Sequence, residues 1–187
     1  LFKMVGSGYR HKYLSEGNDT RGIDVAVMMR EETRDGQRIE FVQMQSHAHL
    51  TYEMLGLWEP ELEGRAQPHE RVFKRDCLEI DFRIGGKPLT LYVVHFKSMG
   101  SSRDGIPGRE WTMPIRRAEA RAVRKIITDR FHGQTDNKRF AICGDFNDYY
   151  ERLVITGDRR NGFDFTPVSE AGSSLDVLLS DGFAVNP

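Results

Sequence analysis

The sequence has few cysteines, no long apolar run and almost no net charge. Its two cysteines, Cys77 and Cys143, exclude a disulfide-rich scaffold, and both lie in apolar segments typical of buried free thiols. No apolar run reaches the roughly 18 residues of a membrane-spanning helix, and residues 1–10 lack the apolar stretch of a signal peptide, so we expect a cytoplasmic protein without a transmembrane segment. The 27 basic and 28 acidic residues give a net charge of -1, so a site for a polyanion has to be local.

Length and composition predict one domain. A chain of 187 residues with 39% hydrophobic content buries one substantial core, so we assign residues 1–187 to a single domain. Because the chain starts at Leu1 without an initiator methionine and runs at once into apolar residues, we expect further residues upstream.

Two hairpins are predicted from the β-rich segments. Ile23 to Met29 and Ile39 to Met44 are separated by a charged turn with Asp35-Gly36. Cys77 to Ile84 and Leu89 to Phe96 are joined by Gly85-Gly86-Lys87-Pro88, whose two glycines suit a tight turn with positive φ angles.

The other segments alternate between loops, one helix and one strand. His47 to Gln67 keeps no clear period and is predicted as loop, and the glycine-rich Met99 to Met113 as a mobile surface loop. An amphipathic helix is predicted to begin at Pro114, and Phe140 to Gly144 is apolar enough for a strand buried on both faces. Tyr149 to Pro187 is weakly patterned.

The last ordered element predicted is a short helix at Ser174 to Ser180 with a serine cap. Strand pairs followed by a helix and another strand indicate an α/β sandwich of mostly antiparallel sheets.

A carboxylate and a carboxamide stand two residues apart in Gly144-Asp145-Phe146-Asn147-Asp148. At the end of a strand, Asp145 and Asn147 share one side, where a carboxylate orients or deprotonates a water and an amide donates a hydrogen bond to a phosphoryl oxygen. The alternative is simple turn chemistry at a strand end.

Two further polar groups suit phosphate. His95 and Lys97 share one face where an apolar strand ends, and Arg21-Gly22 leads into the first strand. Taken singly, His95 is more often an ordinary hydrogen-bonded residue, and Arg21 an ordinary surface side chain.

The order and spacing of these motifs resemble the endonuclease/exonuclease/phosphatase superfamily, which includes pancreatic-type deoxyribonucleases. The resemblance covers residues 17 to 150, and the GDFND stretch is its most specific part. It implies a four-layered α/β sandwich of two packed, mostly antiparallel sheets, and a Mg²⁺-dependent or Mn²⁺-dependent hydrolase of phosphate esters.

The resemblance also implies residue roles. Asp145 would activate the attacking water, Asn147 would hold a phosphate oxygen, both would contribute to the metal site, and His95 would stabilise the scissile phosphoryl group. Arg21 and Lys97 would contact the substrate phosphate. As substrates, we rank nucleic-acid or nucleotide phosphodiesters ahead of phosphomonoesters and phospholipids. The resemblance implies no protein partner.

Two motifs of the superfamily are missing. The sequence has neither the early glutamate that is the main metal ligand nor an Asp-His pair near its end. We therefore expect a fragment of a longer enzyme, lacking terminal strands and inactive alone. The alternative is an inactive relative that binds phosphate ligands or nucleic acid. The helix has a basic flank that we interpret as a solvated face, with binding along a phosphate backbone as the alternative; its residues are Arg116, Arg117, Arg121, Arg124 and Lys125.

Overall fold

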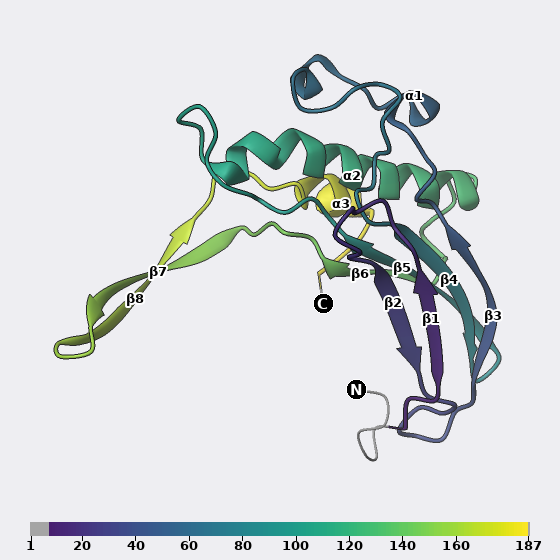
Figure 1. Ribbon diagram of the computed structural model, residues 1–187. Coiled ribbons are helices and arrows are strands. Elements are labelled where there is room, and N and C mark those ends of the chain that lie inside the picture. The colour runs from purple at the N-terminus through teal and green to yellow at the C-terminus, as the bar shows by residue number, and fades with distance from the viewer. Residues whose placement is uncertain (1–7, 187) are drawn as a thin grey trace.

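A four-stranded sheet forms the centre of the computed structural model, which describes residues 8–186 (Figure 1). Its strand order is β3 (Ile39–Ser46), β4 (Cys77–Ile84), β5 (Lys87–His95) and β6 (Phe140–Asp145). The first three strands are antiparallel, and β6 pairs with β5 in parallel. With its helices, the protein is a mixed α/β fold, as predicted.

The hairpin between β4 and β5 confirms the prediction for this segment. Gly85 and Gly86 have φ angles of 55° and 80°, so both positions of the two-residue turn need the left-handed backbone that glycine adopts readily. Lys87 and Pro88, expected in the turn, already pair with β4. This hairpin brings the chain back so that β5 ends at His95.

The first predicted hairpin is wrong. β2 (Val25–Met29) pairs with β1 (His11–Ser15) in a separate two-stranded sheet, whereas β3 pairs with β4. The predicted turn does form, since the N–H of Gly36 donates to Thr33, but the two strands diverge beyond it. The reason is that Met29 is buried against Ile80 and Phe82 of the central sheet, so the apolar side of β2 packs face to face on that sheet.

Helix α2 (Gly108–Arg130) covers the opposite side of the central sheet, where its apolar row packs on Cys77, Tyr92 and Val94. The helix begins before Pro114, so the predicted start and part of the predicted loop from Met99 to Met113 are wrong. Pro114 lies inside the helix, and side chains satisfy carbonyl groups of this first part: Arg116 donates to Arg109 and Arg65 donates to Trp111.

The segment predicted as loop before β4 contains two short helices, α1 (Tyr52–Leu55) and η1 (Pro60–Leu62). The Thr51 hydroxyl caps α1 by accepting the N–H of Met54. Tyr52 and Leu62 are fully buried in the same core cluster as the apolar row of α2. Tertiary burial, which the irregular sequence pattern does not reveal, therefore fixes this segment.

Strand β6 is not buried on both faces, contrary to the prediction. It is the last strand of its sheet, and Ala141 and Cys143 are exposed. The described residues place no strand beside its outer edge.

The two cysteines differ in burial. Cys77 is buried and Cys143 is exposed, and both are free thiols, so the predicted burial is confirmed only for Cys77.

The segment predicted as weakly patterned contains a hairpin of β7 (Glu151–Asp158) and β8 (Gly162–Ser169), which projects away from the rest of the protein (Figure 1). One face of this arm is apolar and exposed; its large side chains are Leu153, Ile155, Phe163 and Phe165. The chain then returns to pack α3 (Asp176–Leu179) against α2, followed by η2 (Ser180–Gly182). The predicted serine cap is wrong, because the Ser174 hydroxyl donates to Asp148.

Candidate active site at the ends of β5 and β6

The parallel pairing of β5 and β6 places His95 and Asp145 opposite each other at the carboxyl ends of the two strands. Nε2 of His95 lies 3.8 Å from Oδ2 of Asp145. The side chain of Asp145 is 63% exposed and that of His95 is 26% exposed, so both are open to a ligand. The structure thus brings together two of the residues singled out from the sequence.

Gly144 allows this pairing. Its φ angle is 134°, and a Cβ atom there would lie 1.9 Å from the carbonyl oxygen of Val94 on β5. A side chain at this position would force the two strands apart and move Asp145 away from His95. The glycine before Asp145 therefore has a direct steric role.

Hydrogen bonds to Asp145 and to the backbone of Phe96 hold Asn147 in place. Its φ angle is 48°, and its backbone N–H donates to Oδ1 of Asp145 at 2.8 Å in a tight turn that asparagine tolerates. Its Nδ2 donates to the carbonyl oxygen of Phe96 at 3.0 Å, which leaves the side-chain carbonyl oxygen as the atom that can accept from a ligand.

Arg75, which the sequence analysis did not select, is the inner cation of this end of the sheet. It is 2% exposed; its Nη1 donates to the carbonyl oxygen of Phe96 at 3.2 Å, and its Nε lies 3.0 Å from Oδ2 of Asp19. The charged triplet Lys74-Arg75-Asp76 immediately before the apolar strand β4 was a signal in the sequence that could have identified it.

Arg21 joins this cluster through Asp19. The Arg21 guanidinium lies 2.8 Å from Asp19, which therefore bridges Arg21 and Arg75. These contacts hold the pKa of Asp19 well below its usual value, because Arg21 donates hydrogen bonds to it and Arg75 adds a nearby positive charge. Gly17 lets this loop come close, since a Cβ atom there would lie 2.6 Å from the backbone of Arg75.

The cations of this cluster affect one another. Burial lowers the pKa of His95, and the positive charge of Arg75 lowers it further, so His95 is mainly neutral at pH 7. Burial and the charges of Arg75 and Arg21 likewise lower the pKa of Lys97. Positive charges crowded in this way favour the binding of an anion, which relieves their repulsion.

Asp148 has a different role from its neighbours in GDFND. Its side chain is fully buried, and its carboxylate accepts the backbone N–H of Ser174 at 2.7 Å and the Ser174 hydroxyl at 2.8 Å. Arg109 donates to the same carboxylate at 3.0 Å, and the Arg116 guanidinium lies 3.7 Å away. Asp148 therefore ties the start of α2 to the segment before α3.

This network corrects the prediction that the arginines of the helix form a solvated face. Arg116 is fully buried beside Asp148, and Arg117, Arg121 and Arg124 are half-buried. Burial would raise the pKa of Asp148, but hydrogen bonds from Ser174 and Tyr149 and the charge of Arg116 lower it overall. An ionised carboxylate therefore remains inside the protein.

A metal ion would find a small set of ligands here. No group of three histidine, cysteine, aspartate or glutamate side chains arranged for a metal occurs among residues 8–186. The Asp145 carboxylate and the Asn147 amide oxygen are ligand types that Mg²⁺ prefers, and Mg²⁺ often uses only one or two carboxylates together with water and substrate phosphate. The donors at this site fit such a partial set.

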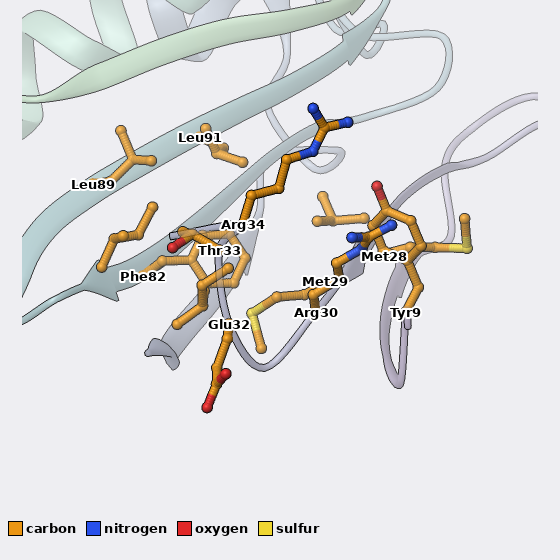
Figure 2. A pocket seen from close by; sticks show the side chains of 13 residues that line it. Tyr9, Met28, Met29, Arg30, Glu32, Thr33, Arg34, Phe82, Leu89 and Leu91 are labelled. Carbon is orange, nitrogen blue, oxygen red and sulfur yellow. The ribbon is translucent and has the colours of Figure 1, made fainter. Parts of the chain in front are cut away.

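The two main cavities are separate from this cluster. A cleft of about 330 Å³ opens between β2 and the β4–β5 hairpin, with Phe82, Leu89 and Leu91 on one side and Met29 on the other (Figure 2). A larger pocket of about 600 Å³ lies beside β6 and is lined by Phe140, Phe146 and Leu178. Neither is lined by His95 or Asp145.

Comparisons with protein-family models, with curated proteins and with solved structures found no match for this chain. Among the described residues, no helix combines the length and the apolar character needed to cross a bilayer.

Proposed function

We propose that this chain carries the phosphate-binding and water-activating part of a metal-dependent phosphoesterase, with phosphodiesters of nucleic-acid or nucleotide type as the favoured substrates. The observation that supports it most is the exposed Asp145 carboxylate beside His95, at the edge of a fixed group of cations formed by Arg75, Lys97 and Arg21. The resemblance of the GDFND stretch to the superfamily points to the same chemistry, and the complete four-layered sandwich belongs to this proposal.

In the proposed reaction, the cations bind the phosphoryl oxygens and hold the ester in place. Neutral His95 donates a hydrogen bond from its ring to a phosphoryl oxygen on which negative charge develops. Asp145 orients the attacking water and accepts its proton.

Asp145 and Asn147 would hold Mg²⁺ or Mn²⁺ at this site. A bound divalent ion supplies additional positive charge to the phosphoryl oxygens as the P–O bond to the leaving group breaks. His95, Arg21 and Lys97 would act on the other oxygens of the phosphoryl group.

A second function is a binding module for phosphate ligands without hydrolysis. In hydrolysis, the Asp145 carboxylate beside His95 would have to serve both the water and the metal. Binding of a phosphate ligand alone needs only the cations of the cluster.

The test is hydrolysis of bis-p-nitrophenyl phosphate and p-nitrophenyl phosphate by the full-length protein with Mg²⁺, Mn²⁺ or EDTA, together with calorimetric binding of sulfate. Turnover that is lost in EDTA supports the phosphoesterase, and the preferred ester separates a diesterase from a monoesterase. Sulfate binding without turnover supports the binding module. If the protein neither binds sulfate nor hydrolyses either ester, both functions are rejected.

A further inference from the structure

Glu119 is a buried carboxyl group directly beneath the proposed phosphate site. It lies on α2 with no exposed surface, and its Oε2 accepts the backbone N–H of Lys97 at 2.6 Å. The backbone of Lys74 also lies close to this carboxyl group and acts to lower its pKa. One carboxyl group therefore joins the two segments that carry the inner cations of the site.

One oxygen of this group is unsatisfied. Oε1 of Glu119 is buried and has no hydrogen-bond partner among the described residues. A buried carboxylate with an unpaired oxygen is costly, and a proton on the group lowers that cost. In agreement, burial raises the pKa of Glu119 to about 7, although the hydrogen bond from Lys97, the backbone of Lys74 and the charge of Arg75 act in the other direction.

The surroundings of Glu119 are mainly cationic. Five charged or titratable groups interact electrostatically with Glu119. Lys74 and Arg75 precede β4, Lys97 follows β5, Arg116 lies on α2 and Tyr52 on α1. The ionised carboxylate is therefore a built-in anion that shares its cations with any phosphate bound above it.

An anion on the outer side of these cations repels the negative charge beneath them. Binding of the anion therefore favours the protonated form of Glu119, and by reciprocity the protonated form binds the anion more tightly. We propose that Glu119 couples the binding of a phosphate-type anion at this site to the uptake of one proton. This inference rests on the proposed phosphate site and concerns its regulation.

The proposal predicts a specific pH dependence. Because Glu119 is mainly protonated below its pKa and ionised above it, the affinity for the anion falls as the pH rises through about 7.

The experiment is titration of the full-length protein with sulfate, whose charge stays constant over this range, by calorimetry at pH 7.5 in buffers of different ionisation enthalpy. We expect uptake of about half a proton per sulfate bound, for a pKa that rises by roughly one unit on binding. In Glu119→Gln this uptake disappears and the affinity no longer falls between pH 6.5 and 8.5. Glu110→Gln, at an exposed glutamate of the same helix, is expected to keep the uptake at pH 7.5.

The outcomes separate this inference from the proposed function. Absence of sulfate binding by the wild-type protein removes the phosphate site and the coupling with it. Binding without proton uptake, or uptake that persists in Glu119→Gln, overturns the coupling alone. If Glu119→Gln does not fold, NMR titration of the Glu119 carboxyl carbon in the wild-type protein tests the coupling instead. The coupling requires that the pKa of Glu119 rise when sulfate is added, and an unchanged pKa overturns it.

Discussion

Nη1 of Arg75 donates a hydrogen bond of 3.2 Å to the carbonyl oxygen of Phe96, the residue between His95 and Lys97. The side chain of Phe96 is buried in the core under α2, so this contact fixes the guanidinium to a rigid part of the sheet. The nearby carboxylate of Asp19 restricts movement of the guanidinium at its Nε end. A cation fixed from two sides needs little reorganisation when an anion binds.

Arg75→Gln is expected to weaken sulfate binding about tenfold, because it removes this fixed charge. It should also raise the pKa of His95, which Arg75 lowers. Sulfate titration and NMR of the His95 imidazole measure the two effects. Arg34→Gln, at an exposed arginine beside the distant cleft, serves as the control and should change neither. An unchanged pKa of His95 in Arg75→Gln would show that the two side chains are not coupled.

Replacement of His95 or Asp145 by alanine tests the proposed chemistry. Each variant of the full-length protein should hydrolyse the preferred ester roughly two to four orders of magnitude more slowly, because each removes a group that acts on the phosphoryl group or the water. Both side chains are partly exposed, so the melting temperature should change little. Asp164→Ala on the projecting arm is the matched control. Near-normal turnover would remove the substituted residue from the mechanism.

The sequence predicts those parts of the fold that local chemistry fixes. The Gly85-Gly86 hairpin and the helix with its buried alanines follow from turn chemistry and periodicity, and both are present. The partner of β2 depends instead on burial of Met29 against the central sheet. No local pattern could have shown this choice.

The candidate site shows the same division. His95 and Asp145 could be selected because both follow apolar strands, and parallel strands bring their carboxyl ends together. Arg75, Asp148 and Glu119 gain their importance from burial and from partners far away in the chain. Arginines and acidic residues are common on surfaces, so nothing in the sequence shows that Asp148 and Glu119 are inside, and only the charged triplet before β4 points to Arg75.

Asp148→Ala is expected to destabilise the protein by about 3 kcal/mol or more, because it leaves Arg116 and Arg109 without their buried anion and removes the oxygen that accepts both hydrogen bonds from Ser174. Urea unfolding followed by circular dichroism measures the change in the free energy of unfolding. Asp164→Ala, at an exposed aspartate of the arm, should stay within about 0.5 kcal/mol of the wild type. Equal stability of both variants would contradict the structural role of Asp148.

The lowered pKa of Asp148 predicts how the free energy of unfolding depends on pH. The folded state lowers the pKa of Asp148 below its ordinary value of 3.8, so the ionised group stabilises the folded protein above that pH. This stabilisation is lost as the pH falls through the lowered pKa. The difference in unfolding free energy between the wild type and Asp148→Asn should therefore be constant near neutral pH and shrink below about pH 3.8. A difference that persists at pH 2 would mean that the charge of Asp148 is not what stabilises the fold.

The arm of β7 and β8 is expected to contribute little to the stability of the rest of the protein. Its strands pair with each other and pack extensively on no other described helix or strand, and Leu153 and Phe165 are 61% and 58% exposed. Because substitution of an exposed side chain removes little buried surface, Leu153→Ser and Phe165→Ser should each change the free energy of unfolding by less than about 0.5 kcal/mol. Leu178→Ser, a buried leucine of α3, is the control that should lose several times more. Urea unfolding of the three variants measures these changes, and a loss at Leu153 as large as that at Leu178 would mean that the apolar face of the arm is covered in solution.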